Sequence, residues 1–107
     1  DLGSIQAFET VELSFLQDQR SWIFFPTEVT CYVAPEKIFS KNVPAQIIAA
    51  EVPSSEIEIK TIRFNTEGQS SRYIKIVAKN LGDLPNWHLG SPYKGKAWIF
   101  IDEITIK

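Results

Sequence analysis

Two polar, aromatic-rich segments carry the side chains that could bind a ligand. Residues 16–27 and 80–96 are long for connections in a small domain, and loops of more than about 12 to 15 residues are often functional. Pyranose rings present apolar CH faces that stack on Trp or Tyr, and their hydroxyls need planar polar partners such as Arg, Asn or His. Both segments contain this mixture. We therefore predict a sugar-binding site formed by Arg20, Trp22, Trp87, His88 and Tyr93.

The same aromatic residues admit a second interpretation. Large aromatic side chains often close the ends of a sandwich, and any one tryptophan more commonly packs than serves as a ligand platform. Trp98 is assigned to packing because it lies inside a strand pattern. An exposed, concave surface around Trp87 and Tyr93 would favour a glycan, whereas a flat apolar patch would favour contact with another protein domain.

Catalytic constellations are hard to assemble from these residues. His88 is the single histidine and Cys31 the single cysteine, so neither a Ser/His/Asp site with a nucleophile elbow nor a zinc site is indicated. Asp102 and Glu103 are neighbours on a predicted strand and point to opposite faces, so they cannot form the carboxylate pair of a glycosidase. The residues indicate a binding domain and not an enzyme.

Charge and hydropathy argue against two classes of partner. Eleven basic and thirteen acidic side chains give a formal net charge of -2, so no electrostatic attraction to nucleic acid is expected. A membrane-spanning helix needs roughly 20 apolar residues in a row, and the longest apolar run here has the length of one buried strand. We expect no nucleic-acid partner and no membrane insertion.

Strands must position the two loops, because no segment has apolar residues at helical spacing. Period-2 alternation predicts strands over residues 7–15, 28–34 and 73–79, with a weaker strand over 47–52. Cys31 lies on the apolar face of its strand, which predicts a buried and unreactive thiol. The 107 residues therefore indicate a single all-β domain, a sandwich.

Two further strands have features of their own. Over residues 57–64 the apolar alternation changes parity near Lys60 and Thr61, which predicts a β-bulge or a strand break there. The last strand, residues 97–106, is apolar on both faces over its first five positions. We therefore expect it in the middle of a two-layer core.

A family resemblance rests mainly on the last third of the chain. Residues 72–82, 84–90 and 95–104 include the motifs Leu-Pro-Asn-Trp-His and Trp-Ile-Phe-Ile-Asp-Glu-Ile, and the opening Asp-Leu-Gly and residues 15–29 fit the same pattern. These stretches closely resemble the C-terminal domain of bacterial family 20 β-N-acetylhexosaminidases, often called chitobiases. The resemblance covers nearly the whole chain.

The resemblance implies a discoidin-like domain of the coagulation factor 5/8 C type. Such a domain is an eight-stranded jelly-roll β-sandwich of the galactose-binding class, related to family 32 carbohydrate-binding modules. It implies a non-catalytic accessory module of a periplasmic or extracellular bacterial glycosidase. The partner would be a glycan containing N-acetylhexosamine or galactose, or the alternative partner would be the neighbouring catalytic domain of the same chain.

The resemblance also implies a structural calcium site and an additional strand. In related sandwiches an early loop and a carboxylate near the C-terminus hold the ion, and the resemblance places that carboxylate at Glu103. The family has a first strand before the Asp-Leu-Gly that opens this chain, so we expect the N-terminal strand to be lacking here and the calcium site to be incomplete. The family's usual Ser-x-Asp-Gly turn is replaced by Ala-Pro-Glu-Lys at residues 34–37.

Overall fold

The computed structural model describes residues 1–39, 44–48 and 52–107, and it is all-β. Its strands are β1 (Gln6–Ala7), β2 (Thr10–Gln17), β3 (Glu28–Ala34), β4 (Ala45–Ile47), β5 (Glu58–Asn65), β6 (Ser70–Ser71), β7 (Tyr73–Lys79) and β8 (Phe100–Ile106). Two short 3-10 turns, η1 (Gln19–Ser21) and η2 (Ser91–Tyr93), lie in the long loops. Within the described residues, no helix is long and apolar enough to cross a membrane.

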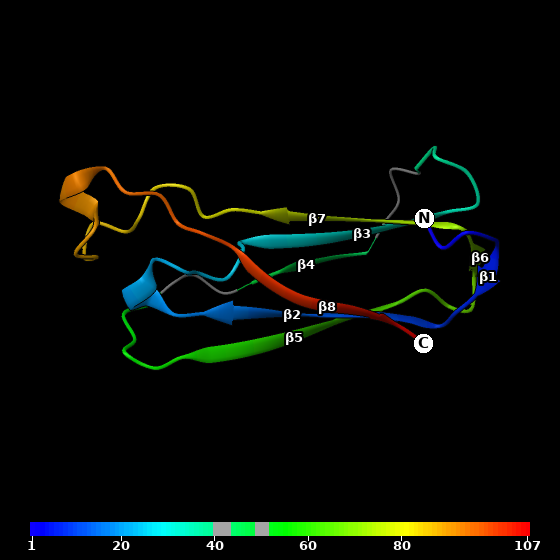
Figure 1. The fold of residues 1–107 in the computed structure, drawn as a ribbon, viewed down its shortest axis with the longest axis horizontal. Coiled ribbons are helices and arrows are strands. Elements are labelled where there is room, and N and C mark those ends of the chain that lie inside the picture. The colour runs from blue at the N-terminus through cyan, green and yellow to red at the C-terminus, as the bar shows by residue number, and fades with distance from the viewer. Residues whose placement is uncertain (40–43, 49–51) are drawn as a thin grey trace.

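Two antiparallel sheets, ordered β5-β2-β8 and β4-β3-β7, face each other, and β1 pairs with β6 at one end. Figure 1 shows both long loops at the same end of the sandwich, opposite the two termini. The predicted all-β architecture is confirmed. The sheets hold the loops at one end because β2 leads into the first loop and β7 leads into the second.

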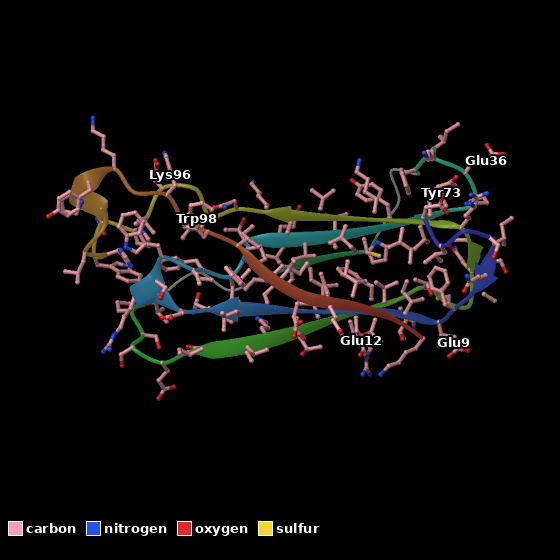
Figure 2. All side chains as sticks on the ribbon, viewed as in Figure 1. Glu9, Glu12, Glu36, Tyr73, Lys96 and Trp98 are labelled. Carbon is pink, nitrogen blue, oxygen red and sulfur yellow. The ribbon has the colours of Figure 1, made fainter. Side chains whose placement is uncertain are left out.

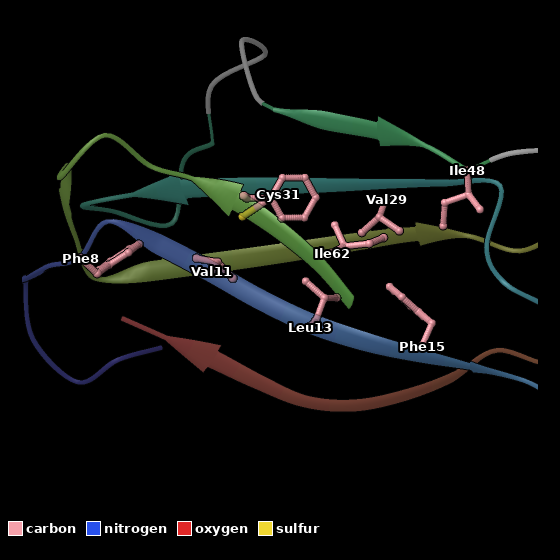
Figure 3. Packing of buried hydrophobic residues seen from close by; sticks show 9 residues of the cluster. Phe8, Val11, Leu13, Phe15, Val29, Cys31, Ile48 and Ile62 are labelled. Atoms are coloured by element: carbon pink, nitrogen blue, oxygen red, sulfur yellow. The ribbon is translucent and has the colours of Figure 1, made fainter. Parts of the chain in front are cut away.

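The core lies between the two sheets. Alternate residues of β2 and β3 point inward, as period-2 strands require, and they meet the inward residues of β5 (Figure 3). The buried cluster consists of Phe8, Val11, Leu13, Phe15, Val29, Cys31, Ile48, Ile62 and Phe64. The predicted burial of Cys31 is confirmed, since its side chain is 1% exposed.

The predicted bulge or break near Lys60 and Thr61 is wrong. β5 is continuous and pairs with β2 without a slip from Thr10↔Asn65 to Gln17↔Glu58. The parity changes because Ile59 lies on the outer face, 73% exposed, whereas Ile62 lies in the core. The irregularity occurs instead between β2 and β8, next to Leu13 and Phe15.

The prediction for the last strand is also wrong in two respects. β8 begins at Phe100, and it is an edge strand whose residues are all exposed, not the middle of a two-layer core. Trp98 is 65% exposed, because its backbone bonds to Trp22 and Phe24 while its side chain faces outward. The predicted strand over 47–52 shares only Ile47 with β4, which spans Ala45–Ile47. Ile48 and Val52 are not in a strand, and residues 49–51 lie outside the described part of the chain.

Candidate functional site

Gln19 ties the first long loop to the segment that precedes β5. Its side chain is 3% exposed. Its Nε2 donates to the Val52 carbonyl oxygen at 2.6 Å, and its Oε1 accepts from the Ser54 N–H at 2.7 Å. A buried amide that satisfies two backbone groups in this way fixes their separation. The loop containing Arg20 is therefore held against residues 52–55.

His88 ties the second long loop to the first. Its Nε2 lies 2.5 Å from the Gln19 carbonyl oxygen, and its Nδ1 accepts from the Gly90 N–H at 2.9 Å. A carbonyl can only accept and an N–H can only donate, so these partners select the neutral tautomer with hydrogen on Nε2. His88 is 8% exposed, and both ring nitrogens are occupied within the protein.

Trp22 is held in a left-handed conformation, with φ of 66°. This region is costly for a bulky residue and persists only where its surroundings enforce it. The Trp22 N–H donates to the Gln19 carbonyl, and the Trp22 carbonyl accepts from the Trp98 N–H. Its indole lies so close to Gly90 and Gly95 that a Cβ at either glycine would fall 2.8 Å from a ring atom. Glycine at both positions lets the second loop close over the indole.

These contacts frame an open pocket of about 610 Å³ at the loop end of the sandwich. Its lining includes Arg20, Trp22, Ser54, Ser55, Trp87 and His88. The Trp87 indole is 40% exposed, and its inner side contacts Phe24 and His88 with ring centroids about 6 Å apart. Arg20 is exposed on η1, and no salt bridge among the described residues engages it. The pocket therefore offers an apolar aromatic face, a guanidinium and two hydroxyls.

No protein-family model and no curated protein matches this chain. The geometry of this pocket and the resemblance of the sequence motifs therefore support the function proposed below.

Four of the five predicted sugar-binding residues come together. Arg20, Trp22, Trp87 and His88 all line the pocket, which confirms the expected meeting of the two long loops. Tyr93 lies on η2, is 81% exposed and is not part of the lining. The roles within the four also differ, since His88 and Trp22 hold the loops together whereas Arg20 and Trp87 present surface to solvent.

Gln19 and residues 53–55 also line the pocket, and the sequence did not predict them. Gln19 continues the inward parity of Leu13 and Phe15, but a glutamine at such a position is usually exposed, so its type conceals its burial. Residues 53–55 precede β5 in a Pro-Ser-Ser stretch that reads as an ordinary connection. Only the pairing of Gln19 with Val52 and Ser54 brings this stretch to the pocket.

Glu103 lies on β8, outside the pocket lining. Its carboxylate is exposed, and its N–H donates to the neighbouring Asp102 Oδ1 at 2.8 Å. Calcium takes six to eight oxygen ligands, roughly, and the described residues contain no cluster of three or more His, Cys, Asp or Glu side chains placed to hold a metal. The calcium role of Glu103 stays a prediction.

Proposed function

We propose that this chain is a non-catalytic carbohydrate-binding module of a bacterial glycosidase of the β-N-acetylhexosaminidase type. The observation that supports it is the half-exposed Trp87 indole in the wall of a concave pocket of about 610 Å³, with Arg20 beside it. Small-ligand pockets are commonly about 300 to 1,000 Å³ and combine an apolar wall with a few placed polar groups. The proposal includes the jelly-roll, galactose-binding-like fold and a periplasmic or extracellular location.

Each exposed group has a task in glycan binding. The Trp87 ring accepts the apolar CH face of a pyranose, while its other contacts, Phe24 and His88, hold the ring in place. The Arg20 guanidinium donates to ring hydroxyls or to an N-acetyl carbonyl. The Ser54 and Ser55 hydroxyls can both donate and accept. The resemblance to the family 20 accessory domains adds the identity of the ligand, a glycan containing N-acetylhexosamine or galactose.

The proposal of a binding module without catalysis follows from the same contacts. His88, the one histidine, has both ring nitrogens bonded to the backbone and cannot take a proton from a nucleophile without breaking that frame. Cys31 lies in the core, where burial raises the pKa of its thiol to about 11. Neither side chain is available as a base or nucleophile in the pocket.

The test is a glycan array on the purified chain, followed by titration calorimetry with the best oligosaccharide. We expect Trp87→Ala to weaken binding at least tenfold, which corresponds to about 1.4 kcal/mol. Tyr93→Ala is the matched control, because it removes an exposed aromatic ring at the same end but outside the pocket lining. Binding unchanged in Trp87→Ala, or no glycan bound at any concentration, would contradict the proposal.

A second candidate function is attachment to the catalytic domain of the same polypeptide, and one observation favours it. Ile59, Leu16 and Phe100 are in register across β5, β2 and β8, on the face opposite the core. Ile59 and Phe100 are 73% and 56% exposed and line a hollow of about 290 Å³. An exposed apolar row of this kind suits protein contact. Ile59→Lys should leave glycan binding intact and weaken co-purification with a separately expressed catalytic domain.

A further inference from the structure

The lining of the pocket at the loop end contains a single charged side chain among the described residues. That side chain is Arg20, which is exposed on η1. No aspartate or glutamate of the described residues belongs to the lining. A sugar hydroxyl both donates and accepts, so a neutral sugar is held best where donors and acceptors are both present. The donors and acceptors that the lining offers therefore bear on the kind of sugar that fits.

The side-chain acceptors of the lining are engaged within the protein. Gln19 Oε1 accepts from the Ser54 N–H at 2.7 Å, and His88 Nδ1 accepts from a backbone N–H of its own loop at 2.9 Å. The Ser54 Oγ accepts from the Glu56 N–H at 3.1 Å. Apart from the Ser55 hydroxyl, each side-chain acceptor in the described lining thus already has a protein donor.

Donors of the lining remain available to a ligand. The Arg20 guanidinium donates and cannot accept, and no salt bridge among the described residues engages it. Because the Ser54 Oγ accepts a backbone N–H, its own hydrogen can be directed to a ligand. Trp22 and Trp87 add only indole N–H groups, which donate and do not accept. The described lining is therefore rich in donors and poor in acceptors, and this composition suits an anion.

The acidic side chains closest in sequence to the lining lie outside it. Asp18 accepts at Oδ2 from a hydroxyl of its own turn at 2.9 Å, and Glu56 is exposed. Neither belongs to the lining. Glu9 and Glu36 lie at the opposite end of the sandwich (Figure 2). In the part of the lining that the structure describes, no carboxylate therefore competes with an anionic ligand for the guanidinium.

We propose that the sugar held by this pocket is acidic, a pyranose whose ring carries a carboxylate; this assignment rests on the proposed function. The ring lies on the Trp87 indole, and its carboxylate accepts two parallel N–H bonds from the Arg20 guanidinium. The Ser54 hydroxyl supplies a further donor. A glycan in which a uronic or sialic acid adjoins N-acetylhexosamine or galactose combines this group with the sugars that the resemblance implies.

A planar carboxylate fits these groups better than a sulfate ester does. Its two oxygens match the two parallel N–H groups of one guanidinium. A sulfate ester spreads its charge over three terminal oxygens, and the described lining has no second cation for the third oxygen. Removing a charged group from water without a partner is costly. The negative charge of the ligand is therefore expected on a carboxylate.

The test compares acidic sugars with their neutral counterparts by titration calorimetry on the intact chain. Sialyllactose is paired with lactose, and a hyaluronan oligosaccharide is paired with its carboxyl-reduced form. We expect the acidic member of at least one pair to bind about tenfold more tightly or better at low salt, and the two pairs distinguish sialic from uronic acid. The difference should shrink as the salt concentration rises, because ions screen an exposed charge pair. Sulfated lactose that bound as tightly as the better acidic sugar would overturn the assignment to a carboxylate.

Two charge-removing variants separate pairing at Arg20 from general attraction. Arg20→Gln should lower the affinity for the acidic sugar to that for its neutral counterpart and change the neutral affinity less than about twofold. Lys94→Gln is the matched control and should change neither affinity, because it removes a positive charge from an exposed residue that follows η2 and lies outside the lining. Both substitutions are at exposed positions, so both variants should unfold at the same urea concentration as the unchanged chain.

The outcomes distinguish this assignment from the proposed function. Acidic and neutral sugars bound with equal affinity, or an equal loss of both in Arg20→Gln, would overturn the acidic sugar and leave the binding module standing, provided that Trp87→Ala weakens binding. No binding of any sugar, acidic or neutral, would overturn both.

Discussion

At the scale of single residues, His88 is a positioning residue whose contacts are all internal. Removing its ring would leave the buried Gly90 N–H without a partner and would take from the Gln19 carbonyl one of its two donors, the other being the Trp22 N–H. Each unsatisfied buried group costs about 1–3 kcal/mol. We expect His88→Ala to lower the free energy of unfolding by about 2–4 kcal/mol, measured by urea denaturation.

Trp87→Ala is the comparison for that experiment. Trp87 is more exposed than His88, and no buried backbone group depends on it, so it should lose less stability and more glycan affinity. If His88→Ala unfolds at the same urea concentration as the unchanged chain while losing ligand, His88 contacts the ligand and the assigned tautomer is wrong.

Cys31 provides a second prediction at this scale. Burial raises the pKa of its thiol to about 11, whereas an unfolded cysteine has a pKa near 8.5, roughly. At pH 8 the thiolate fraction is thus roughly a hundredfold lower in the native protein. We expect a thiol reagent to label native protein at least a hundredfold more slowly than protein in urea.

The same shift predicts how the pH alters stability. Because the folded-state pKa of Cys31 is the higher one, the protonated thiol favours the native state fully below a pH of about 8.5, and this contribution is lost as the pH rises toward 11. Cys31→Ala should flatten that part of the stability profile. In the labelling experiment, a native protein that reacts with the thiol reagent as fast as the unfolded one would show that the thiol is accessible.

At the scale of elements, two substitutions in β5 test its observed pairing register with β2. Ile59 and Ile62 are three residues apart in one continuous strand, so they lie on opposite faces. Ile62 is 1% exposed and Ile59 is 73% exposed. We expect Ile62→Ala to cost about 2–4 kcal/mol and Ile59→Ala to cost less than about 0.5 kcal/mol in urea denaturation. Equal losses of stability in the two variants would contradict the continuous register and support the bulge that the sequence pattern predicts.

β5 and β8 also show where sequence patterns fail. Alternation of apolar and polar residues identifies β2, β3 and β7. In each of these strands, either one face alone is apolar or the apolar face is continuous. In β5 the exposed face carries apolar residues too, so the alternation of apolar residues looks like a one-residue shift in register. In β8 apolar residues on both faces suggested a central strand, although the strand lies at an edge. Exposure of apolar residues depends on neighbouring elements, which a local pattern does not contain.

At the scale of the whole molecule, the sequence predicted that the two long loops meet but not how. Arg20, Trp22, Trp87 and His88 could be named because aromatic and planar polar residues are concentrated in long loops. Gln19 could not, because its buried bonds to Val52 and Ser54 join segments more than thirty residues apart. The sequence places Tyr93 in the same loop as Trp87 and His88, but the turn at η2 carries it away from the pocket lining.

At the same scale, the predicted calcium site gives the last prediction. Asp102 and Glu103 are adjacent on an exposed edge strand, and one or two carboxylates cannot fill a shell of roughly six to eight oxygens. We expect millimolar calcium to leave Tm of this chain unchanged within about 1 °C. A rise in Tm that Glu103→Gln abolishes would show that the site is complete in these residues.

The bonds that frame the pocket are directed to the main chain, and this has a consequence for engineering. Gln19 and His88 bond to carbonyl oxygens and N–H groups, which every residue except proline presents alike. The side chains of Arg20, Ser55 and Leu89 take no part in these bonds although they line the cavity. A combinatorial library at those three positions should therefore change ligand preference while preserving the scaffold, so that new specificities can be selected without rebuilding the loops.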